Sequence, residues 1–166
     1  MEEEAIGAIC GIDPGKSGGI AFIAPSTGAL AWLLPMPSMV DLARILDDTH
    51  PSLVILEKAQ SMPKQGIASA FNYGEHFGII QGFLIALQIP HQLVTPRDWQ
   101  KEMFKGCKTS DPPKKRALMA VQRIYPQANL LATERSRMPH DGIIDALLIA
   151  KWGWLKYESR EGARGA

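Results

Sequence analysis

Four acidic residues stand where a folded chain could bring them together. Asp13 and Glu57 each follow a short apolar run that is typical of a buried strand. Asp141 and Asp145 are four residues apart, so a helix would place them on one face, one turn apart. Several carboxylates without a basic neighbour favour a divalent cation, and oxygen-only ligands favour Mg²⁺ or Mn²⁺ over zinc. Two such ions held about 3.5–4 Å apart support phosphodiester hydrolysis.

Each of these residues also has an ordinary structural explanation. Asp13 opens a glycine-rich turn, a strand-end Glu57 can be solvated, and Asp141 suits the positive end of a helix dipole. Two acids at strand ends followed by a pair on a late helix are, however, much less expected by chance. The sequence has no Gly-x-x-x-x-Gly-Lys-Ser pattern and no credible Ser-His-Asp set.

The elements that must position the four acids follow from hydrophobic patterning and turn residues. Apolar runs between turns predict strands over 5–12, 19–24, 29–34, 53–56 and 90–94. Apolar periodicity and capping residues, with Ser38 and Asp111 as N-caps, predict helices over 39–49, 66–87, 96–103, 112–125 and 141–157. Short turns join the first three strands, which favours an antiparallel meander, and later strands return through helices. We expect an α/β fold with a five-stranded mixed sheet and helices on both faces.

The charge balance is close to neutral overall but uneven along the chain. The 166 residues carry 18 basic and 17 acidic side chains, for a net charge of +1. Residues 1–60 hold three basic against eight acidic residues, whereas residues 97–137 hold ten basic against four acidic ones. This separation favours an anionic pocket beside a cationic surface; the alternative is that the charges scatter over solvated faces.

Length and composition limit the class of protein. We expect one domain over residues 1–157 and a flexible tail over 158–166. No apolar run approaches the roughly 20 residues of a membrane span, the first residues are acidic, and two cysteines make no disulfide framework. These features predict a cytoplasmic protein without a membrane partner. We also expect a bacterial or phage origin rather than an organellar one.

Three segments resemble the signature segments of RuvC-type Holliday junction resolvases, which are ribonuclease H-like endonucleases. They are Gly11–Gly15, Ile55–Glu57 and His140–Ala150, in the family's order. The resemblance implies that Asp13, Glu57, Asp141 and Asp145 are catalytic metal ligands. It further implies two Mg²⁺ ions per site, for which Mn²⁺ would substitute, and products that carry a 5′ phosphate.

The chain departs from the best-known bacterial members in two places. Their last two ligands are three residues apart, so the spacing of Asp141 and Asp145 looks nearer to the phage and chloroplast branch. The segment after Glu57 is also longer, which leaves Met62 and Phe71 as weak candidates for opening the junction. His140 is either a ligand or a polar residue at the start of the helix, and we favour the helix-start role.

The resemblance gives the basic stretch a role in binding branched DNA through phosphate contacts. The candidate DNA-binding residues are Lys64, Lys105, Lys108, Lys114, Lys115, Arg135 and Arg137. Lys114 or Lys115 is expected near the scissile phosphate.

Paired cuts across a four-way junction need two sites, and a twofold homodimer supplies them. Gly74, Gly78 and Gly82 recur every fourth residue within the helix predicted over 66–87. They favour close approach of another backbone. That backbone belongs either to a second copy, with help from Phe71, Phe77 and Phe83, or to the sheet of the same chain.

We therefore expect a metal-dependent, structure-selective endonuclease that resolves four-way DNA junctions. A related nuclease acting on RNA–DNA hybrid or on branched and flap DNA is the alternative. A non-catalytic nucleic-acid-binding module is less consistent with four retained carboxylates.

Overall fold

The computed structural model describes residues 7–58 and 66–164, except for the side chains of residues 67–69 and 158–164. The elements follow one another as β1 (Ile9–Asp13), β2 (Gly19–Ile23), β3 (Leu30–Pro35), α1 (Met39–Thr49), β4 (Leu53–Glu57), α2 (Ile67–Ala86), β5 (His91–Val94), α3 (Pro96–Met103), α4 (Pro113–Ile124) and α5 (Asp141–Arg164). Each corresponds to a segment that the sequence predicts, so the predicted order of elements is confirmed.

The strands form one mixed sheet in the order β3-β2-β1-β4-β5. Strand β2 is antiparallel to both β1 and β3, whereas β4 is parallel to its two neighbours, β1 and β5. Ile12 of β1 pairs with Leu56 of β4, so Asp13 and Glu57 follow side by side at the carboxyl ends of adjacent parallel strands. The sheet therefore brings together two acids that are 44 residues apart in the chain.

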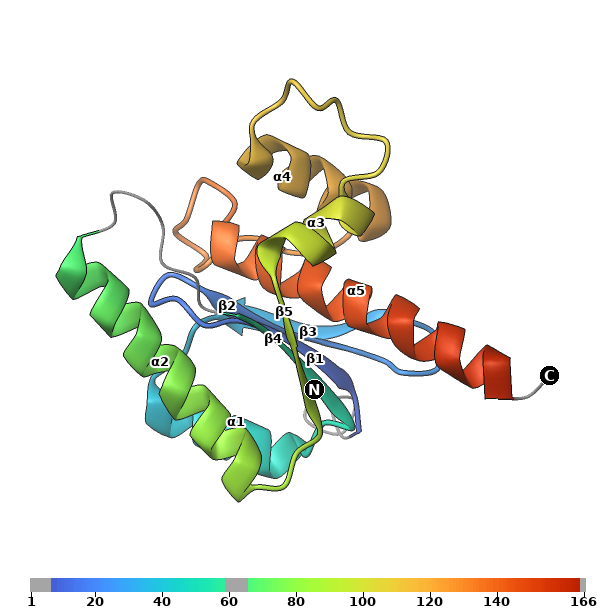
Figure 1. The fold of residues 1–166 in the computed structure, drawn as a ribbon. Helices are drawn as coiled ribbons and strands as arrows, with labels where there is room; N and C mark the ends of the chain where they lie inside the picture. The colour runs from blue at the N-terminus through green and yellow to red at the C-terminus, as the bar shows by residue number, and fades with distance from the viewer. Residues whose placement is uncertain (1–6, 59–65, 165–166) are drawn as a thin grey trace.

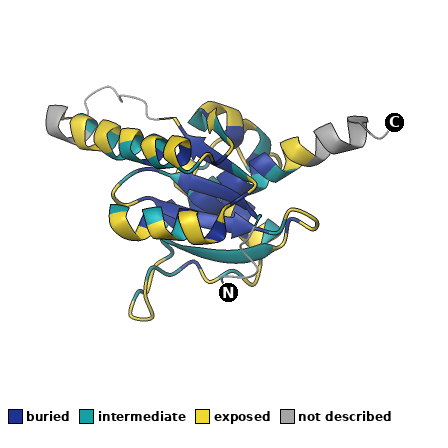
Figure 2. Ribbon diagram, turned by 90° about the horizontal axis from the view of Figure 1, so that it is seen from below, coloured by how far each residue is buried: buried dark blue, intermediate teal, exposed yellow. Residues whose placement is uncertain are grey.

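Helices cover both faces of the sheet, as predicted (Figure 1): α1 and α2 lie on one face, and α3, α4 and α5 lie on the other. Side chains alternate along each strand. Cys10 and Ile12 of β1 enter the core beneath α1 and α2, whereas Ile9 enters the core beneath α5. Strands β1, β2 and β4 are buried between the two helical layers, whereas the edge strand β3 is only partly buried (Figure 2). The same alternation places Asp13 and Glu57 on the α5 side.

The backbone of helix α5 packs directly against the backbones of β1 and β2, because glycines lie at the contact points. A Cβ atom on Gly11 would lie 2.2 Å from the carbonyl oxygen of Ala146. A Cβ atom on Gly142 would lie 2.3 Å from the carbonyl carbon of Gly18. Because no side chain separates them, the backbones of the helix and the sheet pack directly against each other. This contact fixes the position of the first turns of α5.

Two details of the helices differ from the predictions. The N-cap of α4 is Pro112 and not Asp111, because the Asp111 carboxylate accepts a 2.8 Å hydrogen bond from Lys115 instead of capping the helix. Helix α5 continues to Arg164, beyond the expected end at Tyr157. Good helix formers follow Tyr157, and a single glycine in a helix costs only about 1 kcal/mol. The division into a domain over 1–157 and a tail over 158–166 stays a prediction.

The predicted N-cap of α1 is confirmed. Ser38 caps α1 by accepting a hydrogen bond from the Asp41 amide, and Thr95 caps α3 in the same way through Asp98. Cys10 is buried in the core. Within residues 7–58 and 66–164, none of the helices combines the length and apolar character that crossing a bilayer requires. The cytoplasmic location and the bacterial or phage origin stay predictions.

Candidate active site

The four acidic side chains that the sequence predicts as a group come from three elements. Asp13 ends β1, Glu57 ends β4, and Asp141 and Asp145 lie in the first two turns of α5. We call these four residues the carboxylate cluster. Glu57 is only 9% exposed, and Asp145 is also largely shielded, whereas Asp141 lies at the surface. The cluster therefore has a buried floor and one solvent-facing member.

His140 stabilises the start of α5. Its Nδ1 atom accepts a 3.3 Å hydrogen bond from the amide of Ile143, which is the contact of a helix-capping side chain. The favoured helix-start role is thereby supported.

Burial raises the pKa values of the three inner carboxyls. Burial, and then the charges of Asp13, Glu57 and Asp141, raise the pKa of Asp145 to about 8. Burial raises the pKa of Glu57 to about 7, and the charge of Asp13 adds to that effect. The pKa of Asp13 is also raised by burial, although the Gly15 amide donates a 3.3 Å hydrogen bond that opposes the rise. The shared shifts show that these carboxyls lie near one another without enough positive charge to balance them.

Two aromatic residues that the sequence analysis missed contact Glu57. The indole Nε1 of Trp99, fully buried in α3, donates a 2.6 Å hydrogen bond to Glu57 Oε1. Tyr73 of α2 also hydrogen-bonds Glu57, and burial followed by the charges of Glu57 and Asp13 raises the pKa of its hydroxyl. A buried indole N–H needs an acceptor, and that requirement is the signal that could have linked Trp99 to a strand-end acid.

Lys114 is the basic residue of the expected pair that reaches the cluster. Its Nζ forms a hydrogen-bonded ion pair with Asp141 Oδ2, and this contact raises the pKa of Lys114. Lys115 points elsewhere and pairs with Asp111. Lys114, Asp141 and Asp145 also line a small hollow of about 70 Å³ between α3, α4 and α5.

The donor chemistry of the cluster suits a hard divalent cation. All its ligand atoms are carboxylate oxygens, and the inner three carry charge that no described lysine or arginine pairs with. Across the described residues, no three His, Cys, Asp or Glu side chains stand close enough together to hold one ion as they are oriented here. The case for metal binding therefore rests on the type of donor atom and on the uncompensated charge. The side chains would have to move closer together to coordinate an ion.

The other candidate DNA-binding residues lie on the α3–α4 side or just before α5. Lys105 pairs with Glu102 at 2.7 Å, and Lys108 is exposed in the loop before α4. Arg135 and Arg137 are exposed in the segment that leads into α5. Lys64 lies outside the described residues, as does Met62, and Phe71 is 71% exposed on α2.

Comparisons with known proteins place this architecture. The sequence matches no family model and no curated protein. The structure is similar to two structures of Thermus thermophilus RuvC, one of which is a complex with a Holliday junction substrate. The complex has a TM-score of 0.63 at 17% identity, with coverage of 91% of this chain and 95% of that chain. The other RuvC structure has a TM-score of 0.62 at 17% identity, with coverage of 92% of this chain and 96% of that chain.

The yeast mitochondrial Holliday junction resolvase Ydc2 is also similar, with a TM-score of 0.52 at 15% identity and coverage of 95% of this chain and 86% of that chain. These matches span nearly the whole of the chain, and they agree with the resemblance seen in the sequence segments. The protein therefore has the ribonuclease H-like fold of the RuvC-type resolvases.

Proposed function

We propose that this protein is a metal-dependent, structure-selective DNA endonuclease that resolves four-way junctions. The observation that carries the proposal is the carboxylate cluster, in which Asp13, Glu57 and Asp145 are shielded from water at one edge of the sheet without a basic partner. Uncompensated buried charge costs folding free energy, so it is typical of a functional site. The similar RuvC structure contains a Holliday junction substrate, which favours branched DNA as the partner.

The cluster would hold two Mg²⁺ ions, with Mn²⁺ able to substitute, because hard cations prefer carboxylate oxygens. Bound ions of this kind would supply an activated water and would stabilise the leaving oxygen, giving a 5′ phosphate. Asp13, Glu57 and Asp145 would form the inner ligands. Asp141 would be the fourth ligand, and it is also the residue with which Lys114 forms an ion pair.

The chain's own residues have separate tasks in this scheme. Trp99 fixes one oxygen of Glu57 and so orients its carboxylate. Lys114 has an exposed, flexible side chain at the entrance to the cluster, from which it can move from Asp141 to a phosphate oxygen. Lys64, Lys105, Lys108, Lys115, Arg135 and Arg137 would hold more distant phosphates. Such contacts position the backbone with little base preference.

A homodimer would supply the two sites that paired incision requires. The α2 surface fits this role, because Gly74, Gly78 and Gly82 are exposed and, apart from the nearby backbone of α2 itself, no described atom lies within 4 Å of a Cβ built on any of them. The alternative that these glycines pack against the sheet of the same chain is therefore wrong. Phe71 and Ile85 add exposed apolar surface to the same helix, whereas Phe77 and Phe83 pack into the core.

The proposal is tested by incubating the protein with Mg²⁺ and a four-way junction, a duplex, a flap and an RNA–DNA hybrid of matched length. We expect symmetric nicks in the junction and little cleavage of the other three. Asp13→Asn should abolish cleavage and leave junction binding measurable, because it removes one charge but preserves the shape of the side chain.

The exposed Lys58→Ala variant, beside Glu57 but outside the cluster, is the control for altered charge near the site. Junction cleavage by Asp13→Asn would overturn the metal assignment. Preferred cleavage of the hybrid would replace the junction with the alternative substrate.

A further inference from the structure

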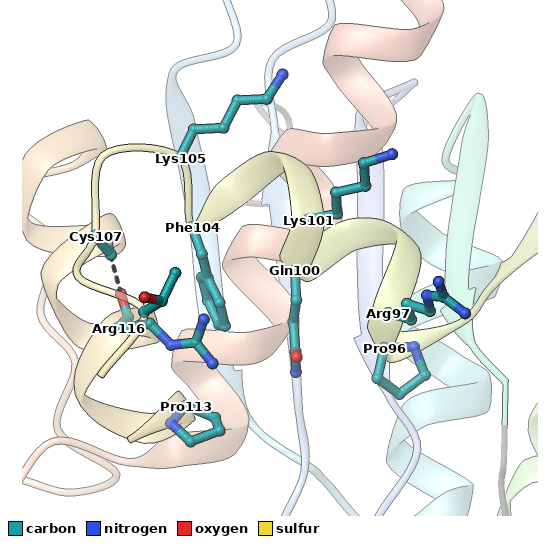
Figure 3. Close-up of a pocket in the computed structure, with 10 residues that line it drawn as sticks. Pro96, Arg97, Gln100, Lys101, Phe104, Lys105, Cys107, Pro113 and Arg116 are labelled. Atoms are coloured by element: carbon teal, nitrogen blue, oxygen red, sulfur yellow. Dashed lines mark hydrogen bonds between the residues drawn. The ribbon is translucent and has the colours of Figure 1, made fainter. Parts of the chain in front are cut away.

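A second hollow, of about 710 Å³, lies between α3 and α4 and has no place in the proposed cleavage step (Figure 3). It is large enough for a nucleotide-sized group, since ligand pockets typically run from about 300 to 1,000 Å³. We call it the α3/α4 hollow. Its walls come from the exposed face of α3, the loop that follows α3, and the first turn of α4.

The lining of the α3/α4 hollow is strongly cationic. Four basic residues line it and no acidic residue does: Arg97, Lys101, Lys105 and Arg116. Lys105 is partly neutralised by its 2.7 Å ion pair with Glu102. In the described part of the chain, no ion pair involves any of the other three. Four positive charges that share one concave surface repel one another, and an anion would relieve that repulsion.

Arg116 is held in place before any ligand arrives. Its guanidinium carbon lies 4.9 Å from the centre of the Phe104 ring, and its Nε is buried without a hydrogen-bond partner among the described residues. Figure 3 shows this guanidinium beside Phe104 and directed toward Gln100. A planar guanidinium fixed by stacking binds phosphate oxygens with little loss of side-chain entropy.

The α3/α4 hollow adjoins the small hollow beside the carboxylate cluster. Gln100, Phe104 and Pro113 line both the α3/α4 hollow and the small hollow that contains Asp141 and Asp145. An extended polyanion that has one phosphate at the cluster would therefore meet the basic hollow within a short distance along its backbone.

We propose that the α3/α4 hollow is a binding subsite for a non-scissile phosphodiester of the cleaved DNA strand. This inference rests on the proposed function, because it takes the strand at the cluster to be DNA. Arg97 and Lys101 supply mobile cations at the rim, and Arg116 supplies a fixed one on the Phe104 wall. The subsite sets which nucleotide of the strand lies over the carboxylates.

The experiment measures junction binding with Ca²⁺ in place of Mg²⁺, for Arg97→Ala and Lys101→Ala separately. Both side chains are exposed, so their loss does not endanger folding. Arg44→Ala is the matched control, because Arg44 is an exposed cation of α1 on the opposite face of the sheet. Each hollow variant should bind about tenfold more weakly. The slope of log affinity against log salt should fall by about 0.9 per lost contact.

A phosphate scan then locates the contact. A single uncharged methylphosphonate replaces one phosphate at a time, over about five nucleotides on each side of the cut. Successive positions then lie roughly 3.4 Å apart along the helix axis. At one position, a methylphosphonate should weaken binding by the wild type but should not weaken binding by Arg97→Ala any further, because that variant has already lost the contact. Additive losses at every position would overturn the subsite, as would hollow variants that behave like Arg44→Ala while junction cleavage persists. Absence of junction cleavage by the wild type would instead overturn the proposed function.

Discussion

Helices α5 and α2 both bring side chains to the carboxylate cluster, yet they meet the rest of the chain in opposite ways. On the α5 side, Gly11 and Gly142 stand where a Cβ would strike backbone atoms at 2.2–2.3 Å. On the α2 side, the three spaced glycines face open surface. The same residue type therefore serves two purposes: it fixes α5 to the sheet, and it leaves α2 with a smooth face that none of the described residues covers.

The largest expected effect comes from filling the α5 contact. Gly142→Ala would place a methyl group against the backbone of Ser17 and Gly18, which cannot move aside as a side chain can. We expect the free energy of unfolding to fall by about 3 kcal/mol or more, as measured by urea denaturation. The same substitution at Gly78 is the control. Equal losses of stability for the two substitutions would contradict the proposed difference in packing between α5 and α2.

A smaller effect on stability is expected from the ionisation of the buried carboxyl that α5 contributes, that of Asp145. The folded-state pKa values of Asp145, about 8, and Glu57, about 7, lie above their ordinary values of 3.8 and 4.5. The folded state therefore binds protons more tightly than the unfolded state. Without metal, stability should fall as pH rises from about 4 to about 8.

Asp145→Asn removes the largest of these shifts. Near pH 8 its melting temperature should exceed that of the wild type by about 2–8 °C, which corresponds to about 1–2 kcal/mol of unfolding free energy. Near pH 4 the two melting temperatures should differ little. Added Mg²⁺ should stabilise the wild type and narrow the difference, because it binds the folded carboxylates. A melting temperature of the metal-free wild type that rises over the same pH range would contradict this explanation.

The smallest effect sharpens the α2 side of the comparison. Gly78→Ala should stabilise the isolated chain by roughly 0.5–1 kcal/mol through helix propensity. It should also weaken self-association, which sedimentation equilibrium measures, if a second copy packs against the glycines. Exposed Glu75→Ala on the same helix serves as the control. Unchanged association of Gly78→Ala would exclude the glycine face as the dimer interface.

Local patterning was sufficient to predict most of the fold. Apolar runs bounded by turn residues gave the strands, and the strand-helix-strand order gave the parallel pairing that sets Asp13 beside Glu57. The separation of Lys114 from Lys115 was not predictable, because adjacent helix positions differ by about 100° and the phase of α4 depends on its packing. Asp111 shows a related limit: its sequence position suits a cap, and a competing contact with Lys115 decides otherwise.

Long-range contacts within the site were beyond sequence patterning. Trp99 reaches Glu57 across 42 residues, and only the folded arrangement of α3 against the sheet shows it. Gly11 lies within the strand predicted over 5–12, and nothing in that pattern indicates its decisive role, which is the space it leaves for Ala146. The assignment of metal and DNA contacts to individual residues stays a prediction that the experiments above address.

The backbone contact between Gly11 and α5 has a consequence for protein design. A designer who copied only the four acids onto another sheet would leave out residues that carry no functional group at all. Gly11, Gly19 and Gly142 let α5 approach the strands closely enough for Asp145 to sit above Asp13 and Glu57. A transplant of this arrangement would have to carry those glycines first, and the carboxylates second.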